Sequence, residues 1–418
     1  MKSWITYNSN CDFSIYNIPF GIYSINGGKK RVASIIGSKV IDICELFKNG
    51  YLVEFPELNT SVLENEYLND FISLGKKSTS KIREKIQHLF SNENDGLSKN
   101  FEHQQSILLN ELEVEFHLPI RIENYTDFYS SMDHARNVGT MFRDPENALL
   151  PNWKHIPIGY HGRASSITVS GTNFCRPMGQ TKAPDAENPV FGPSKLLDFE
   201  LEMGFVIGKN TELGNAISTD EAADYIFGLS LFNDWSARDI QTWEYVPLGP
   251  FLSKNFCSTL SPWIITMEAL EAFRIKGPEQ NPKVLDYLSF KQDFHFDVNL
   301  QVSITPEGSE ETVVSNSNFK YMYWNMLQQL AHHTVNGCNV KVGDLYASGT
   351  ISGPEKGSFG SMLEITWRGT EPIKMKDGTE RKFINDNDTV TITGFALKDD
   401  VRVGFGKAEA KALPAKVK

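Results

Sequence analysis

Apolar and polar residues alternate with a period of two along much of this chain, a pattern typical of β-strands that bury one face. The longest alternation spans residues 294–304, where every second position is Phe, Val, Leu or Ile. Strand-like runs also span 196–207, 389–393 and 401–405. The Asp377-Gly378 pair predicts a hairpin turn, because these two residue types suit the backbone of tight β-turns.

The first part of the chain predicts a small, mostly β domain that ends near His117. Residues 20–43 suggest short strands separated by turns at Asn26-Gly27-Gly28 and Gly37-Ser38. The period then changes to that of a helix over 81–90, where Ile82, Ile86 and Leu89 share one face.

Beyond residue 119 strands dominate again, with one clear helix predicted over 319–335. Its apolar stripe includes Met322, Met326 and Leu330, and Asn336-Gly337 provides a C-terminal stop. The elements do not follow the regular spacing of a doubly wound sheet. We therefore expect a mainly β protein (β-rich α+β) with domains at 1–118 and 119–418.

Composition and charge fit a globular protein and narrow its partners. Hydrophobic residues make up 40% and charged residues 22% of the chain, which suits a protein with a sizeable core. The net charge of −11 argues against nucleic acid, whose phosphates need a cationic face, but not against a small anionic substrate. The five cysteines form no C-x-x-C pair, no apolar run approaches roughly 18 residues, and the N-terminus does not resemble a signal peptide. We expect a cytoplasmic protein that binds neither nucleic acid nor membrane.

Four acidic residues in apolar surroundings are candidate metal ligands. Period two places Glu200 and Glu202 on one strand face, while Asp127 and Asp234 are flanked by aromatic and apolar residues. If the four converge, neighbouring pairs repel by roughly 4 kcal/mol at about 4 Å, so a cation or protonation is needed. Oxygen ligands favour a hard ion such as Mg²⁺, Ca²⁺ or Mn²⁺. The alternative is a half-buried strand with a solvated acidic face, because spacing alone does not bring these residues together.

A histidine and a group of donors occur near the same acids. His134 follows Asp127 by seven residues and is a candidate general base. Glu364 lies in an apolar run that we interpret as strand-like, and it is the candidate for the group that orients the base. The segment 235–254 contains Arg238, Gln241, Tyr245 and Lys254. The nitrogen donors of the Arg, Gln and Lys side chains could stabilise an oxyanion. The alternatives are a structural histidine and an ordinary surface segment with an aromatic anchor.

Other motifs are discounted. Gly349-Thr350-Ile351-Ser352-Gly353 places the serine one position too late for a nucleophile elbow. His332-His333 falls at the end of the predicted helix, where cationic side chains suit the helix dipole, so we interpret it as structural. The sequence contains no H-E-x-x-H, P-loop or G-x-G-x-x-G motif.

From about residue 119 to its end, and more loosely before that, the chain resembles the fumarylacetoacetate hydrolase family in its long, two-domain form. Several long motifs in the same order support the resemblance, and they span residues 127–135, 141–144, 157–166, 197–203, 233–241, 319–324 and 347–354. The resemblance implies an N-terminal SH3-like barrel, a C-terminal mixed β-roll, a homodimer, and hydrolysis of 4-fumarylacetoacetate to fumarate and acetoacetate at the end of tyrosine and phenylalanine breakdown.

The resemblance also assigns roles to individual positions. It implies that Asp127, Glu200, Glu202 and Asp234 hold a divalent cation, Ca²⁺ or Mg²⁺. It makes His134 the base and Glu364 its orienting partner, with Arg238, Gln241 and Lys254 as the oxyanion pocket. The residues implied to contact the diketo-dicarboxylate substrate are Tyr129, Arg143, Tyr160, Gln241, Tyr245 and Thr350.

The sequence departs from the family pattern after Lys254. A Phe-Gly-Thr-Thr run is usual there, whereas this chain has Cys257-Ser258-Thr259. The family's second, structural Mg²⁺ would therefore have to lie near Lys254 and Ser258, with the serine in place of a threonine. Met132-Asp133 also differs from the polar pair usual before the histidine.

These expectations lead to one mechanism and three competing readings. In the mechanism, His134 activates water, the oxyanion pocket stabilises the tetrahedral adduct, and the cation stabilises the departing enolate. The competing readings are a related acylpyruvate or diketo-acid hydrolase or decarboxylase, a non-catalytic metal-binding β-protein, and a serine hydrolase. A substrate panel, the absence of any turnover, and serine-directed reagents combined with chelators would distinguish them.

Overall fold

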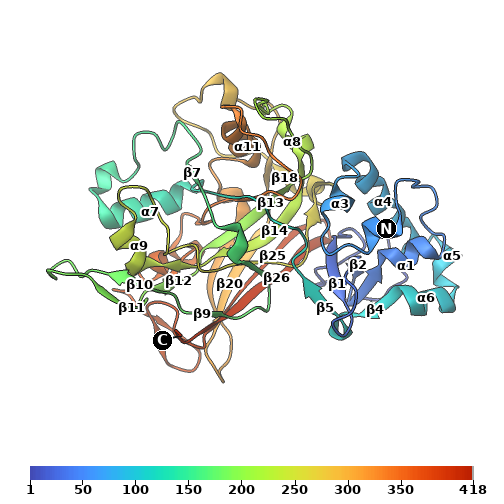
Figure 1. Ribbon diagram of the computed structural model, residues 1–418, viewed down its shortest axis with the longest axis horizontal. Helices are drawn as coiled ribbons and strands as arrows, with labels where there is room; N and C mark the ends of the chain where they lie inside the picture. The colour runs from blue at the N-terminus through green and yellow to red at the C-terminus, as the bar shows by residue number, and fades with distance from the viewer. Residues whose placement is uncertain (417–418) are drawn as a thin grey trace.

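The computed structural model describes residues 1–416 and shows a smaller N-terminal unit beside a larger unit built on long strands (Figure 1). The N-terminal unit contains one antiparallel sheet in the order β4-β3-β2-β1-β5. Its strands are β1 (Gly21–Ser24), β2 (Arg31–Ile36), β3 (Lys39–Asp42), β4 (Leu108–Asn110) and β5 (Glu115–His117). Its helices are α1 (Ile43–Lys48), α2 (Thr60–Leu63), α3 (Asn69–Ile72), α4 (Lys76–Leu89), α5 (Asp95–Ser98) and α6 (Phe101–Ile107).

The predicted turns and the predicted helix of the N-terminal unit are confirmed. Asn26 and Gly27 join β1 to β2 with positive φ angles of 50° and 67°, and Gly37 turns β2 into β3 with a φ of 63°. The helix begins earlier than the pattern indicates, at Lys76, and buries Ile82, Ile86 and Leu89 as expected. The expectation of a mostly β domain is wrong here, because the six helices of this unit contain more residues than its five strands. The SH3-like barrel stays a prediction.

The larger unit is built around a mixed sheet of eight strands, with the path β7-β6-β22-β13-β14-β16-β8 and β17 beside β14. The strands are β6 (Tyr125–Phe128), β7 (Gly159–His161), β8 (Ile167–Val169), β13 (Leu201–Ile207), β14 (Ile226–Asp234), β16 (Ser258–Leu260), β17 (Ile265–Thr266) and β22 (Leu345–Ala347). The pairs β6–β22 and β8–β16 are parallel and the others are antiparallel. This order brings segments that are far apart in sequence to neighbouring positions.

A second sheet of five strands packs against the first, in the order β21-β20-β25-β26-β9. Its strands are β9 (Phe174–Cys175), β20 (Asn299–Thr305), β21 (Thr312–Asn318), β25 (Thr389–Lys398) and β26 (Val401–Leu413). The main core includes Leu229 and Leu231 of β14 together with Leu300, Val302 and Ile392 of the second sheet. A second core lies under the N-terminal sheet and continues onto the eight-stranded sheet.

Short strand pairs and helices complete the larger unit. The pairs are β10 (Met178–Thr181) with β11 (Val190–Pro193), β12 (Leu197–Asp198) with β15 (Ser236–Ala237), β18 (Arg274–Ile275) with β19 (His295–Phe296), and β23 (Ile373–Lys374) with β24 (Glu380–Arg381). The helices are α7 (Met132–Phe142), α8 (Ala222–Tyr225), α9 (Arg238–Glu244), α10 (Met267–Leu270), α11 (Met326–Thr334) and α12 (Met362–Ile365). Across residues 1–416, no helix is long and apolar enough to cross a membrane.

Three predicted elements need correction. The helix expected over 319–335 is a 3₁₀ turn at Phe319–Tyr321 followed by α11, because Asn325 caps the new helix through a box with Gln328. The runs 196–207 and 294–304 each divide into two strands. Glu364 lies in the short helix α12 rather than in a strand, because Ser361 caps that helix through the Glu364 amide. The hairpin at Asp377-Gly378 and the strands over 389–393 and 401–405 are confirmed.

Candidate active site

The four acidic residues singled out in the sequence meet in one buried cluster. One carboxylate oxygen from each of Asp127, Glu200, Glu202 and Asp234 lies within 4.8 Å of those from the other three. Strand order explains the convergence: Asp127 is on β6, Glu202 on β13 and Asp234 at the end of β14, and these strands lie close together in one sheet. Glu200 lies in the break between β12 and β13.

One side of the cluster is neutralised by two buried cations. The Lys254 ammonium lies 2.5 Å from Glu200 Oε2 and 2.8 Å from Asp234 Oδ2, and Arg238 Nη1 lies 2.8 Å from Glu200 Oε1. Burial by itself would raise the pKa of Glu200, but Lys254 and Arg238 hold that pKa well below its usual range. Asp234 also accepts hydrogen bonds from Ser258 Oγ at 2.7 Å and the Tyr160 hydroxyl at 3.3 Å.

On the other side of the cluster, neither Asp127 nor Glu202 forms an ion pair with a described residue, and the Gly349 amide donates to Glu202 Oε2 at 3.1 Å. Asp127 Oδ1 and Glu202 Oε1 are buried and find no hydrogen-bond partner among residues 1–416. Burial and the neighbouring carboxylates raise the pKa of both Asp127 and Glu202 well above the usual range. Two orphaned, convergent carboxylate oxygens fit a hard divalent cation, which would supply the missing partner and offset the repulsion.

His134 and Glu364 form a buried pair beside the cluster. His134 lies in the first turn of α7, where Ser131 caps the helix and accepts the His134 amide. Its ring Nδ1 lies 2.7 Å from Glu364 Oε2. A carboxylate accepts hydrogen bonds, so this contact places the proton on Nδ1 and leaves Nε2 as the basic nitrogen. The histidine lowers the pKa of Glu364 in spite of complete burial.

Glu364 is itself held by three neutral donors. Asn137 Nδ2 donates to Oε1 at 2.9 Å, while the hydroxyls of Ser352 and Ser361 donate to Oε2 at 2.9 and 2.8 Å. These contacts fix the carboxylate that orients the imidazole. The sequence reading did not single out Asn137 or Ser361, because short polar residues near a helix end are common everywhere.

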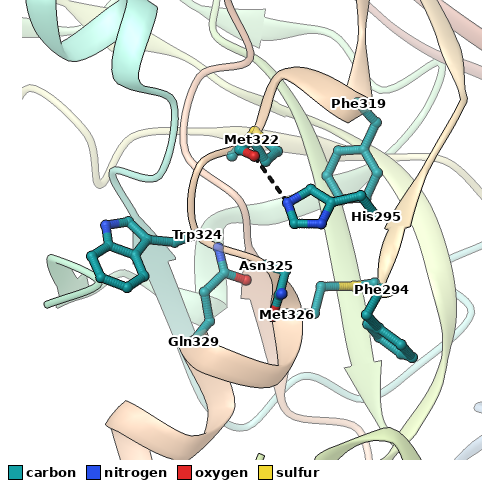
Figure 2. A pocket seen from close by; sticks show the side chains of 8 residues that line it. All are labelled: Phe294, His295, Phe319, Met322, Trp324, Asn325, Met326 and Gln329. Atoms are coloured by element: carbon teal, nitrogen blue, oxygen red, sulfur yellow. Dashed lines mark hydrogen bonds between the residues drawn. The ribbon is translucent and has the colours of Figure 1, made fainter. Parts of the chain in front are cut away.

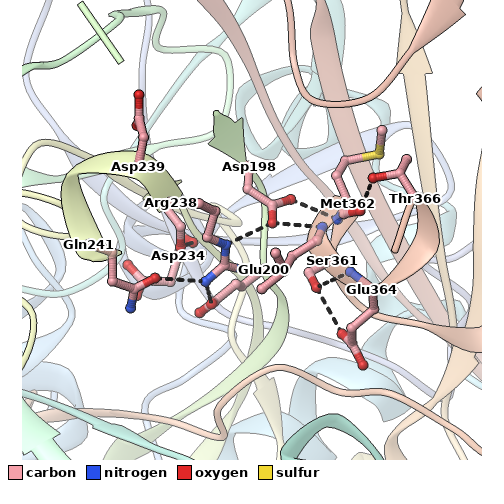
Figure 3. A network of polar contacts seen from close by, with 12 residues as sticks. Asp198, Glu200, Asp234, Arg238, Asp239, Gln241, Ser361, Met362, Glu364 and Thr366 are labelled. Carbon is pink, nitrogen blue, oxygen red and sulfur yellow. Dashed lines mark hydrogen bonds and ion pairs between the residues drawn. The ribbon is translucent and has the colours of Figure 1, made fainter. Parts of the chain in front are cut away.

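Arg238 presents a free donor at the same site. It begins α9, and Figure 3 shows its guanidinium between Asp198, Glu200 and Gln241. The Nε atom donates to Asp198 Oδ2 at 2.8 Å and Nη1 to Gln241 Oε1 at 3.2 Å. The remaining nitrogen, Nη2, is buried without a partner among the described residues.

The predicted substrate-contacting residues divide into two groups. Tyr129 lies edge-on to the His134 ring at 5.3 Å between centroids, Tyr160 bonds Asp234, and Thr350 is buried. Arg143 instead bonds the Ala148 carbonyl at 2.7 Å, and Tyr245 is 52% exposed. Thr350 also follows Gly349, whose amide donates to Glu202 Oε2 at 3.1 Å. The structure therefore brings Tyr129, Tyr160 and Thr350 to the site, and places Arg143 and Tyr245 after the C-terminal ends of α7 and α9.

The pair His332-His333 is structural, but its expected charge is wrong. Burial lowers the pKa of His333 to about 4 and also lowers the pKa of His332, so both rings are neutral at pH 7. The ring Nδ1 of His333 bonds the Tyr346 hydroxyl, and the ring Nδ1 of His332 bonds the Tyr287 hydroxyl.

Comparison with known proteins places these features in a family. The model for the fumarylacetoacetate hydrolase C-terminal region matches residues 123–411, and the model for the fumarylacetoacetase N-terminal region matches residues 16–119. The chain belongs to the fumarylacetoacetate hydrolase family. It is 48% identical to fumarylacetoacetase of Homo sapiens over 99% of both chains, and 49% identical to that of Caenorhabditis elegans over the whole of both. Identity to fumarylacetoacetase of Dictyostelium discoideum is 50%, over 99% of this chain and 98% of the relative.

Two solved structures share the fold of this chain at low sequence identity. Fumarylacetoacetate hydrolase from psychrophilic Exiguobacterium antarcticum aligns over 96% of this chain and all of its own, with a TM-score of 0.54 and 16% identity. Maleylpyruvate hydrolase from Sphingobium sp. SYK-6 aligns over 95% of this chain and all of its own, with a TM-score of 0.50 and 12% identity.

A small cavity elsewhere in the molecule has too little room for the substrate. It lies against α11, has a volume of about 10 Å³, and Figure 2 shows the side chains that line it. A space of this size accommodates about one water molecule. His295 Nδ1, Asn325 Nδ2 and Gln329 Oε1 are among the lining groups and are buried without a partner within residues 1–416.

Proposed function

We propose that the protein hydrolyses the carbon–carbon bond of 4-fumarylacetoacetate to give fumarate and acetoacetate, the last step of tyrosine and phenylalanine breakdown. The observation that carries this proposal is the buried site itself, in which a half-compensated carboxylate cluster adjoins an oriented His–Glu pair. Similarity over nearly the full chain to relatives named fumarylacetoacetase supports the choice of substrate.

His134 acts as the general base in this proposal. Its Nε2 takes a proton from water while Nδ1 stays bonded to Glu364, and the resulting hydroxide oxygen attacks the carbonyl next to the fumaryl group. Glu364 stabilises the imidazolium that forms, because its carboxylate is already ionised and held in place. The proton can later return to the departing carbon, which completes the balance of the reaction.

Three nitrogen donors stabilise the oxyanion that the attack creates. Arg238 contributes Nη2, which is buried and unpartnered, and Lys254 contributes its ammonium. Gln241 accepts from Arg238 through its oxygen, which leaves its amide nitrogen to donate. Fixed donors in a site closed to water stabilise developing charge far more than donors in solution do.

A divalent cation, Ca²⁺ or Mg²⁺, held by Asp127, Glu200, Glu202 and Asp234, would supply Lewis-acid stabilisation to the keto oxygens and the enolate product. Tyr129, Tyr160 and Thr350 would contact the substrate near this cluster, with Arg143 and Tyr245 reaching it from the ends of α7 and α9. A second cation near Lys254 and Ser258 stays a prediction, and the Lys254 ammonium would repel it. The homodimer and the cytoplasmic location likewise rest on the resemblance.

A related diketo-acid hydrolase or decarboxylase is the alternative function. The fold shared with a protein named maleylpyruvate hydrolase supports this alternative. The N-terminal region, which matches the fumarylacetoacetase model, favours the first proposal.

The deciding experiment follows the loss of fumarylacetoacetate absorbance with and without a chelator. We expect turnover that stops with chelator and returns with Mg²⁺ or Ca²⁺, and fumarate and acetoacetate in equal amounts. Maleylpyruvate and an acylpyruvate are the matched substrates, and faster turnover of either would favour the alternative. Turnover that a chelator leaves unchanged would contradict the role of the cation.

A further inference from the structure

Asp198 is a completely buried carboxylate to which the proposed reaction assigns no role. It ends the short strand β12, two residues before Glu200, and has no exposed surface. A buried charge is costly unless several donors surround it, so its retention needs a physical reason. Its contacts in Figure 3 give that reason.

Three donors converge on the Asp198 carboxylate from two separate elements. Arg238 Nε, at the start of α9, donates to Oδ2 at 2.8 Å. The backbone amide of Met362 donates to Oδ1 at 2.7 Å, and that of Leu363 donates to Oδ2 at 3.0 Å. Both amides belong to the first turn of α12. Backbone N–H groups in the first turn have no main-chain acceptor within the helix, so they need a partner from outside it.

The contact with Arg238 determines which nitrogen is free. Asp198 holds the Nε edge of the guanidinium, while Glu200 and Gln241 hold Nη1. The planar group has no freedom to rotate between these anchors, so Nη2 is the nitrogen that remains for a ligand.

The contact with α12 determines where the partner of the base lies. This helix has four residues and contributes Glu364, whose carboxylate bonds His134 at 2.7 Å. So short a helix has little stability of its own, and its position depends on what its ends bind. Asp198 and Ser361 bind those first-turn amides.

We propose that Asp198 is a positioning residue that ties the oxyanion donor Arg238 and the His134–Glu364 pair to a single carboxylate. It touches neither substrate nor cation, and it fixes the separation between the base and the donor that the attack of water requires. Small displacements of such groups cost large factors in rate. This inference rests on the proposed function.

The test is Asp198→Asn, which keeps the shape but replaces one accepting oxygen with a donating NH₂ group. We expect kcat to fall by about 10², with Mg²⁺ affinity changed by less than about threefold because none of the four ligands is altered. The acid limb of the kcat/KM profile should move to lower pH, because a displaced Glu364 stabilises the imidazolium less.

Asp239→Asn is the matched control. Asp239 is also a carboxylate on α9, but it bonds Ser194 and the Lys195 amide, away from the base. We expect this variant to keep wild-type kcat and an unshifted acid limb.

Two further measurements distinguish a failure of this inference from misfolding of the variant and from failure of the proposed function. Should Asp198→Asn not give the wild-type circular dichroism and melting transition, Asp198→Ser, which is smaller and can still accept a hydrogen bond, replaces it with the same expectations. A folded variant with wild-type kcat and acid limb overturns the role of Asp198 even though the wild type turns over the substrate. A kcat loss without any shift of the limb overturns the link to α12. A wild type without turnover refutes the proposed function instead.

Discussion

The two sides of the carboxylate cluster solve the same electrostatic problem in different ways. Glu200 is surrounded by Lys254 and Arg238 and stays ionised in the interior, whereas Asp127 and Glu202 have oxygens without partners and raised pKa values. Four carboxylates within 4.8 Å of one another repel by roughly 3 to 4 kcal/mol per pair. The protein supplies cations for one half of the cluster, whereas the arrangement of the other half could hold a metal ion.

The largest expected effect comes from the uncompensated side. Asp127→Asn and Glu202→Gln should each lower activity by on the order of 10⁴-fold, because the Lewis-acid contribution of several kcal/mol is lost with the cation. Calorimetric titration with Mg²⁺ and the diketo-acid assay measure both losses. The exposed Glu187→Gln is the control, and wild-type Mg²⁺ affinity in either cluster variant would contradict the assignment.

His134→Ala should lower kcat by about 10² to 10⁴-fold while Mg²⁺ affinity stays close to that of the wild type, because the base lies beside the cluster and not in it. Steady-state kinetics and calorimetry check the two halves of this prediction. The exposed His155 provides the matched variant, His155→Ala, which should be unaffected. Full activity of His134→Ala would remove the histidine from the mechanism.

On the compensated side, Lys254→Met should lower kcat by about 10² to 10³-fold, because an oxyanion donor is removed. Its affinity for Mg²⁺ should not fall, since two carboxylates lose a competing cation. The surface variant Lys195→Met controls for the change in net charge. A parallel fall in affinity would instead indicate that Lys254 supports a cation site.

In the metal-free protein, substitutions on the two sides of the cluster should change the free energy of unfolding in opposite directions. Glu200→Gln should lower the free energy of unfolding by about 3 kcal/mol, because it leaves buried Lys254 and Arg238 short of a partner. Glu202→Gln should raise that free energy, because it removes a buried charge that neighbouring carboxylates repel, and the amide oxygen can still accept the Gly349 amide. Urea unfolding in the presence of EDTA measures both, and changes of the same sign would break the comparison.

The smallest expected effect concerns His295, a buried histidine that avoids the cost of a buried charge by staying neutral. Burial lowers the pKa of His295 to about 4, whereas an unfolded chain takes up the proton near pH 6.5. Stability from this group is therefore complete above about pH 6.5 and is lost as the pH falls toward 4, by up to about 1.4 kcal/mol per pH unit. In His295→Gln this part of the slope should disappear, as urea unfolding between pH 7 and 5 would reveal; an unchanged slope would show that His295 is not its source.

Period-two alternation predicted strands such as β20 and β25, because each buries one face against the core. It did not predict β14, in which every residue is buried and no alternation is visible. It failed at Glu364, where four residues between strands form a helix that a run of apolar letters does not distinguish from a strand. The convergence of Asp127 with Glu200 could not follow from spacing, since it depends on the order of strands in the sheet; the family resemblance supplied it. Asp198 was missed, although it shares the parity of Glu200 and Glu202 and could have been grouped with them.

Strand β26, near the C-terminus, binds a segment near the N-terminus. Strand β26 reaches the N-terminal unit, where Gly404 exchanges hydrogen bonds with Asp12 and Asn17, and Arg402 pairs with Asp12 (Figure 1). During synthesis at the ribosome, residues 12–17 therefore stay without these partners until nearly the whole polypeptide has been made. A premature stop codon shortly before residue 401 would keep every residue of the proposed active site. The truncated product would still lack the contacts that β26 makes with residues 12–17, and this segment would be exposed to proteases and chaperones.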